Sequence, residues 1–276
     1  MNPDAKLYID PELTRTVLKH FLRDEIRKVG FEKAVIGLSG GVDSAVSCYL
    51  TAQAIGAHNV LALRLPYQTS SPDSLEHAHI VIEALGVPSE TIDITPMVDP
   101  LFARLADLDA KRKGNVMARQ RMIVLYDRSA ALGGLVIGTS NKTEVLLGYG
   151  TLFGDMASAV NPIGDLYKTQ VRQLAAHLGV PQPLIDKPPS ADLWVGQTDE
   201  GEMGLTYAEA DRLLLMLVDE RYTPVEAIEA GFDAKLVERV WRMVRVNHFK
   251  RRGPIIAKLS SRTIGVDFNY LRDWGY

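Results

Sequence analysis

Six consecutive residues, Ser39 to Ser44, have the types and the spacing needed to hold a phosphate group; they read SGGVDS. Gly40 and Gly41 lack a Cβ, so the backbone can turn sharply there and come close to a ligand. Asp43 or Ser44 could cap a helix that begins at this turn, and the unpaired N–H groups of a first helical turn attract anions. These residues therefore predict a phosphate-binding turn.

The residues on either side of the turn supply the elements that it requires. Ala34 to Leu38 is apolar and partly β-branched, which is typical of a buried parallel strand, and 43–54 has the composition of a buried helix. No lysine follows the glycines, which excludes a Walker A loop, and the spacing differs from G-x-G-x-x-G. An ordinary strand-to-helix turn with a simple cap is the alternative. Six matching positions in this context favour phosphate binding.

The string SGGVDS also resembles the SGGxDS pyrophosphate loop of the ATP pyrophosphatases. That resemblance implies cleavage of ATP between its α- and β-phosphates, which activates a carboxylate, a urea or a carbonyl oxygen as an adenylate. It also implies a Rossmann-like sheet of the ATP pyrophosphatase type.

Composition describes an ordinary globular protein. The 276 residues are 46% hydrophobic and carry a formal net charge of −3, which argues against nucleic acid as a partner. Cys48 is the only cysteine, so no intrachain disulfide can form, and its place in a buried helix indicates an inert thiol. We find no signal-peptide pattern and no apolar run long enough to span a membrane, and we therefore expect a cytoplasmic protein.

Apolar runs alternate with helical patterns along the first two thirds of the chain. This alternation predicts an α/β fold, a doubly wound parallel sheet with helices on both faces. We expect one domain over 1–276, with an α/β core at about 30–180 and a helical C-terminal part at about 205–276. The expected strands are 34–38, 59–66, 89–94 and 135–138. The expected helices are 13–29, 43–54, 71–85, 99–106, 115–132, 165–178, 207–220, 224–230 and 235–249.

In an open parallel sheet, ligands bind at the carboxyl ends of the strands. Asp43 and Glu144 follow different strand ends, so both carboxylates could reach one Mg²⁺ ion, which prefers oxygen ligands. Lys168 could supply a fixed positive charge for the departing pyrophosphate. The simpler interpretations are an acid favoured by a helix dipole for Glu144 and a solvated surface charge for Lys168.

Longer strings of the sequence resemble the NAD synthetase family and occur in the same order from the first helix to the tail. They read KGNVMARQRMIVLYDRSA, GTSNKTEVLLGYGTLFGD, NPIGDLYKTQVRQLA and KPPSADLWVGQTDEGEMGLTY. The resemblance implies that ATP adenylates the nicotinate carboxylate of deamido-NAD (nicotinic acid adenine dinucleotide). Ammonia then displaces AMP and leaves the amide of NAD.

The same resemblance assigns binding roles position by position. The implied ATP-binding residues are Gly37, Ser39, Gly40, Gly41, Val42, Asp43, Ser44, Arg64, Thr139, Lys168 and Ser190. The implied deamido-NAD-binding residues are Asn115, Arg119, Asp155 and Lys250. Asp43 and Glu144 match the family's magnesium ligands. In the family the dinucleotide lies across a dimer interface, which implies a homodimer.

The sequence departs from the commoner family pattern at three positions. Leu152 stands where many members have a lysine that contacts deamido-NAD, and Ala159 replaces an aspartate. The His-Lys pair of the tail reads Phe249-Lys250. These changes concern the pyridine half of the substrate and leave the expected ATP and metal positions intact.

Two further expectations concern the second step of the reaction. Glutamine-using relatives carry a large amidase domain with a catalytic cysteine, for which this chain has no room, so ammonia is the expected nitrogen donor; a separate glutaminase subunit is the alternative source. The segment 184–204 is a candidate lid that would exclude water. Two alternatives remain open: another ATP pyrophosphatase, of GMP-synthetase or tRNA-modifying type, and a nucleotide-sensing module without turnover.

Overall fold

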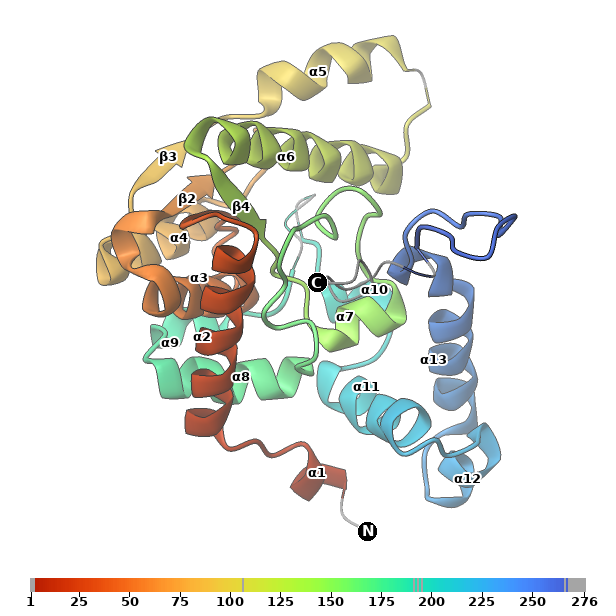
Figure 1. The fold of residues 1–276 in the computed structure, drawn as a ribbon. Helices are drawn as coiled ribbons and strands as arrows, with labels where there is room; N and C mark the ends of the chain where they lie inside the picture. The colour runs from red at the N-terminus through yellow and green to blue at the C-terminus, as the bar shows by residue number, and fades with distance from the viewer. Residues whose placement is uncertain are drawn as a thin grey trace.

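A parallel sheet forms the centre of the molecule. The computed structural model describes residues 3–105, 107–190, 192, 194, 196–265 and 267. Within these residues the chain forms a four-stranded sheet of order β3-β2-β1-β4 (Figure 1). The strands are β1 (Lys33–Gly37), β2 (Val60–Arg64), β3 (Ser89–Thr91) and β4 (Gly134–Ile137). All three pairings are parallel, which confirms the predicted sheet.

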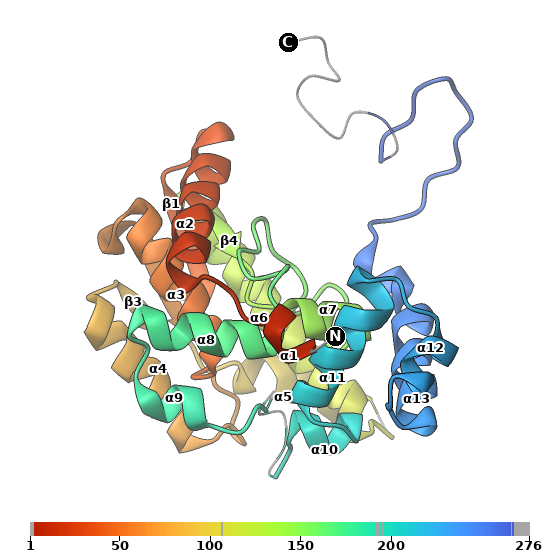
Figure 2. The same ribbon diagram turned by 90° about the horizontal axis from the view of Figure 1, so that it is seen from below.

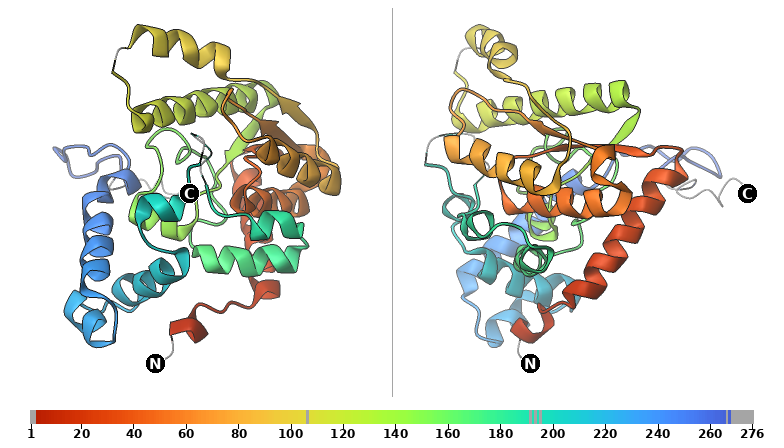
Figure 3. Two further views of the ribbon diagram at one scale, coloured as in Figure 1. Left: turned by 180° about the vertical axis from the view of Figure 1, so that it is seen from behind. Right: turned by 90° about the vertical axis from the view of Figure 1, so that its left-hand side faces the viewer.

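Helices cover both faces of this sheet, as a doubly wound fold requires. One face carries α3 and α4, with α2 and α8 packed beside α3, and the other carries α5 and α6 (Figure 3). The bounds on the first face are α2 (Pro11–Lys28), α3 (Val42–Ile55), α4 (Pro72–Leu85), α8 (Lys168–Leu178) and α9 (Gln182–Asp186). Those on the second face are α5 (Thr95–Arg104) and α6 (Ala110–Leu132).

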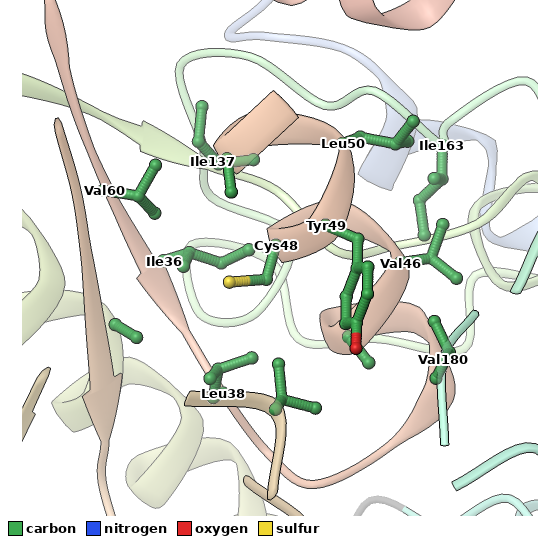
Figure 4. Close-up of a cluster of buried hydrophobic side chains, with 14 of the residues drawn as sticks. Ile36, Leu38, Val46, Cys48, Tyr49, Leu50, Val60, Ile137, Ile163 and Val180 are labelled. Carbon is green, nitrogen blue, oxygen red and sulfur yellow. The ribbon is translucent and has the colours of Figure 1, made fainter. Parts of the chain in front are cut away.

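The core on the α3 face is filled by β-branched and leucine side chains. Ile36 and Val60 from the sheet are fully buried with Val46 and Leu50 from α3 (Figure 4). Cys48 lies in the same cluster, and burial raises the pKa of its thiol to about 12. The expectation of an inert core cysteine is therefore supported by its surroundings.

One apolar cluster fills each face of the sheet, and a third packs the C-terminal helices against the edge of the α/β core (Figure 2). Its helices are α7 (Lys142–Leu147), α11 (Tyr207–Leu214), α12 (Pro224–Glu229) and α13 (Ala234–Val246). The shorter elements include α1 (Pro3–Lys6), η1 (Ala57–Asn59), η3 (His248–Arg251) and α10 (Asp199–Met203). No helix within the described ranges is long and apolar enough to cross a bilayer.

Several element boundaries differ from the sequence-based expectation. The N-cap of α3 is Gly41, so neither Asp43 nor Ser44 caps that helix. The expected helix 207–220 divides into α11 and a π-helical turn, η2 (Leu215–Asp219). The expected loop 184–204 contains α10 and most of α9. Apolar periodicity does not mark such short helices, because they bury only one or two side chains each.

Candidate active site

A cavity opens at the carboxyl ends of β1, β2 and β4. Its volume is about 880 Å³. β1 and β4 are neighbours in the sheet, although the chain leaves β1 toward β2 and β3 before it returns on the other side to form β4. Parallel α/β sheets bind ligands at this kind of topological switch point. Each strand end contributes to the lining through Leu38, Leu65 and Gly138.

The turn after β1 is tightly constrained. Ser44 Oγ donates to the Gly41 carbonyl over 2.9 Å, and the Ser39 backbone N–H donates to Ser44 Oγ over 3.3 Å. Gly40 has a φ of +75°, and a Cβ built there would lie 2.1 Å from the Ser74 carbonyl oxygen of α4. The turn therefore requires glycine at this position, and it presents the free first-turn N–H groups of α3 to the cavity.

Two carboxylates and one ammonium group meet beside this turn. Lys168 Nζ forms an ion pair with Asp43 and lies 3.5 Å from Glu144 Oε1. The Lys168 side chain is 3% exposed, and those of Asp43 and Glu144 are 15% and 16% exposed. The structure thus brings together the three charged residues that the sequence predicted from separate segments.

The pKa values of the cluster show which charge is in excess. Burial alone would lower the pKa of Lys168, but the Asp43 and Glu144 carboxylates outweigh it and hold that pKa above its usual value. Burial raises the pKa of Glu144 to about 8; the Asp43 carboxylate adds to the rise and Lys168 opposes it. Two carboxylates face a single ammonium group, so an additional cation would be stabilised at this cluster.

This donor set fits Mg²⁺. No group of three or more Asp, Glu, His or Cys side chains arranged to hold a metal occurs in the described part of the chain. Mg²⁺, however, typically binds one or two carboxylates and completes its octahedron with waters and substrate phosphates. Asp43 and Glu144 provide those two carboxylates next to a phosphate-binding turn.

Asn141 fixes the relative position of the two acids. As the N-cap of α7, it accepts a hydrogen bond from the Glu144 backbone N–H through Oδ1 over 3.0 Å. Its Nδ2 donates to Asp43 Oδ1 over 3.0 Å. No role was predicted for Asn141 from the sequence, although an Asn followed three residues later by Glu is a capping-box signal.

Lys168 is held from its backbone as well. Its N–H donates to Thr143 Oγ1 over 3.0 Å, and Thr143 donates to Asp211 of α11. Asp211 also accepts the Thr169 backbone N–H over 2.8 Å. The buried Asp211 carboxylate therefore joins α7, α8 and α11 behind the cluster.

Asp199 lines the cavity, and the fully buried Tyr207 lies beside Glu144 and Lys168; neither residue was predicted from the sequence. The Tyr207 hydroxyl lies 3.0 Å from Asp199 Oδ2 and 3.3 Å from Glu144 Oε1. Burial and the nearby carboxylates raise the pKa of Tyr207, so its hydroxyl stays a donor. No local pattern predicts this contact, because Tyr207 is 63 positions from Glu144 in the sequence.

The residues expected to bind deamido-NAD lie at the other end of the same cavity. Asn115, Arg119, Asp155 and Lys250 all contribute to its lining. Three of them make hydrogen bonds with residues of the 148–155 loop. Thr151 donates twice, from Oγ1 to Asn115 Oδ1 and from its backbone N–H to Asp155 Oδ1, each over 2.8 Å. Arg119 Nε donates to the Leu152 carbonyl over 3.3 Å.

Lys250 from η3 binds the start of that loop. Its Nζ donates to the carbonyl oxygens of Gly148 and Gly150 over 2.7 and 2.8 Å. Leu152 and Phe249, two of the departures from the family pattern, also line the cavity. The third, Ala159, lies outside it, and its N–H donates to the Val136 carbonyl over 2.9 Å.

Most of the predicted ATP-site residues line the cavity, but two do not. Gly37, Ser39, Gly41, Val42, Asp43, Ser44, Thr139, Lys168 and Ser190 form part of its wall. Gly40 supports the turn from behind. Arg64 is absent from the lining because Leu63 and Leu65 occupy the cavity side of β2, and its Nε is buried without a hydrogen-bond partner.

Comparisons with known proteins agree with one another. The sequence model of the family described as NAD synthase matches residues 14–254. The NH(3)-dependent NAD(+) synthetase of Trichlorobacter lovleyi is 58% identical over 98% of this chain and 99% of its own length. The NMN synthetase of Francisella tularensis superposes with a TM-score of 0.82 at 35% identity, over 91% of this chain and all of its own. The NH3-dependent NAD synthetase of Campylobacter jejuni, solved with nitrate, gives 0.78 at 32% identity over the same shares.

Proposed function

Because this chain belongs to the NAD synthase family, we propose that it is an ammonia-dependent NAD synthetase, a ligase that amidates deamido-NAD with cleavage of ATP to AMP and pyrophosphate. The observation that carries the proposal is the convergence of Asp43, Glu144 and Lys168 beside a phosphate-binding turn. The cavity continues from this cluster to Asn115, Arg119, Asp155 and Lys250, which gives a second nucleotide a place next to the first.

In the first step, a carboxylate oxygen of nicotinate attacks the α-phosphorus of ATP, and the bond to the β-phosphate oxygen breaks. The first-turn N–H groups of α3 and the Lys168 ammonium stabilise the negative charge that grows on the departing pyrophosphate. Lys168 is suited to this role because its two acid neighbours keep it protonated. No protein nucleophile is needed, since the substrate carboxylate attacks.

The side chains present at this site fit a magnesium ion. Asp43 and Glu144 would hold the ion, which when bound neutralises phosphate charge and polarises the phosphorus centre. Asn141 keeps the two carboxylates at a fixed separation, and Lys168 pairs with both of them.

In the second step, ammonia forms a bond to the carbonyl carbon of the adenylate, the bond between that carbon and the AMP oxygen breaks, and one proton is lost. Water would hydrolyse the same adenylate, so the cavity must exclude water during this step. The segment 184–204 is the candidate for this closure, because Ser190, Trp194 and Gln197 line the cavity. Asp192 ties the segment to α4 by accepting the Ser71 N–H over 2.9 Å.

A homodimer is part of the proposal. Phe153 and Phe249, beside the deamido-NAD end of the cavity, are 58% and 57% exposed. Ile123 and Tyr126 are exposed on α6, the helix that also carries Asn115 and Arg119. A second copy that covers these apolar side chains would bring its own surface to the substrate end of the cavity.

The test is a reconstituted reaction with ATP, Mg²⁺, deamido-NAD and either ammonium or glutamine, in which NAD, AMP and pyrophosphate are measured. We expect equal amounts of all three products with ammonium and none with glutamine. Replacing deamido-NAD with nicotinic acid mononucleotide tests whether the AMP half of the dinucleotide substrate is required. Absence of NAD in the ammonium reaction would reject the proposal.

Asp43→Asn tests whether the cluster of Asp43, Glu144 and Lys168 is needed for the reaction. Pyrophosphate release is expected to fall by roughly 10³-fold or more, since a bound metal supplies several kcal/mol of transition-state stabilisation. Asp165→Asn is the matched control, because the Asp165 side chain is 97% exposed and its ion pair, within the described part of the chain, is with Lys142. ATP binding without turnover by the wild-type protein would instead support a nucleotide-sensing module.

A further inference from the structure

Tyr207, the first residue of α11, lies between the acid–lysine cluster and the short helix α10. Its hydroxyl is 3.3 Å from Glu144 Oε1, and Lys168 Nζ lies 4.9 Å from the centre of its ring. The side chain has no exposed surface. One residue therefore contacts both a predicted metal ligand and the predicted phosphate-binding cation.

Helix α10 holds Tyr207 at two points. Asp199 Oδ2 lies 3.0 Å from the hydroxyl, and Glu200 Oε1 accepts the Tyr207 backbone N–H over 2.9 Å. Asp199 is itself only 4% exposed. Because one helix fixes both the backbone and the tip of the side chain, the hydroxyl cannot turn away from Glu144 unless α10 moves.

Tyr149 provides a built-in comparison. Its hydroxyl lies 3.0 Å from Asp199 Oδ1 and contacts Glu202, so it also binds α10. Tyr149 contacts Glu144 only through the backbone, where its N–H donates to the Glu144 carbonyl over 2.9 Å; among the described residues its hydroxyl makes no hydrogen bond to the Glu144 carboxylate. The two tyrosines therefore share the helix that their hydroxyls contact and differ in whether the hydroxyl also touches the Glu144 carboxylate.

We propose that Tyr207 is a positioning residue that holds Glu144 in the orientation needed to bind the metal of Mg·ATP, and that Asp199 fixes Tyr207 in that position. The identity of the metal-bound substrate rests on the proposed function. Glu144 Oε2 is already fixed from the other side, where it accepts the Asn141 N–H over 3.3 Å. Tyr207 restrains the remaining oxygen, Oε1, and α10 thereby joins the 184–204 segment to the metal site.

The alternative is that Tyr207 only fills the third apolar cluster, to which its ring belongs. Tyr207→Phe separates the two roles, because it keeps the ring under Lys168 and removes only the hydroxyl. Residues that orient a metal ligand typically change metal affinity by about 10- to 100-fold when they are replaced. A packing role predicts an altered melting temperature with unchanged metal affinity.

The measurement is Mn²⁺ binding by electron paramagnetic resonance, with an ATP analogue that has a methylene group between its α- and β-phosphates. We expect Tyr207→Phe to weaken Mn²⁺ binding by about tenfold and to raise the Mg²⁺ concentration for half-maximal NAD synthesis by a similar factor. Tyr149→Phe should stay within about twofold of the wild type in both measurements.

Each outcome bears on one proposal. Unchanged Mn²⁺ affinity in Tyr207→Phe, or an equal loss in Tyr149→Phe, would overturn the positioning role while NAD synthesis by the wild type still stands. A wild-type protein that binds Mn²⁺ and the analogue but makes no NAD would reject the proposed function and leave the positioning role intact. Asp199→Asn, which keeps one acceptor oxygen, is expected to fall between the two tyrosine variants.

Discussion

Gly40 shows how one backbone position determines the shape of the phosphate-binding turn. Its φ of +75° is costly for residues with a side chain, and the Ser74 carbonyl occupies the place of a Cβ. The serine hydroxyls that close the turn add hydrogen bonds but do not replace this requirement, because a Cβ would push the turn away from α4.

We expect Gly40→Ala to lower the free energy of unfolding by at least about 2 kcal/mol and to raise the KM for ATP, because the turn must move to relieve the contact. Urea denaturation and initial rates measure the two effects. Gly30→Ala is the matched control: its φ is +82°, but nothing lies within 4 Å of the added Cβ. It should cost about 1 kcal/mol and leave the KM unchanged. Equal behaviour of the two variants would show that the Ser74 contact does not matter.

Cys48 gives a second test at the same scale. Burial raises the pKa of its thiol to about 12, so almost no thiolate exists at pH 8. We expect no reaction with a disulfide reagent such as Ellman's reagent in the native protein and one equivalent of reaction in urea. Rapid labelling without denaturant would contradict the position of Cys48 in the core.

Among the elements, α7 connects the acid pair to the C-terminal helices. Asn141 caps its N-terminus next to Asp43, whereas Arg251 and Asn247 bind carbonyl oxygens at its C-terminal end over 2.7 and 2.8 Å. A six-residue helix has little stability of its own, so these contacts fix its orientation. Glu144, the proposed metal ligand, is thus positioned by groups at both ends of its helix.

Asn141→Ala is expected to lower the free energy of unfolding by about 1 kcal/mol through loss of the cap, and to reduce kcat by about tenfold or more because Asp43 loses its anchor. Thr223→Ala removes an equivalent capping box from α12, far from the cavity. That control should lose similar stability and keep its kcat. Equal kcat values in the two variants would argue that Asn141 serves α7 alone.

The elements also show what sequence reasoning can reach. Gly86, Gly133 and Gly179, each directly after a helix, have left-handed φ values, as a glycine C-cap requires, and the strand-end rule correctly predicted that Asp43 and Glu144 lie together. Tyr207 was beyond such rules, because its partners depend on how α10 and α11 fold back. Arg64 is the opposite case: its resemblance to a family residue gives no information on which face of β2 its side chain occupies.

At the scale of the whole molecule, the site depends on the meeting of three apolar clusters. The two sheet faces position the turn and the strand ends, and the third cluster packs α11 and α13 against α7, which carries Glu144. The division into an α/β core and a helical C-terminal part stays a prediction. The contacts of Asp211 with both α7 and α8 nevertheless indicate that the two parts would not form a site separately.

The proposed dimer makes a prediction at this scale. Light scattering at micromolar concentration should give a mass twice the 30.5 kDa of one chain. Ile123→Glu places a charge on the exposed apolar face of α6, which a partner chain would have to desolvate, so the mass should fall to that of one chain and the KM for deamido-NAD should rise. Val225→Glu, on an exposed position of α12 away from the cavity, should keep the dimer and the activity. A wild-type protein that has the mass of one chain and is fully active would show that a single copy provides the complete site.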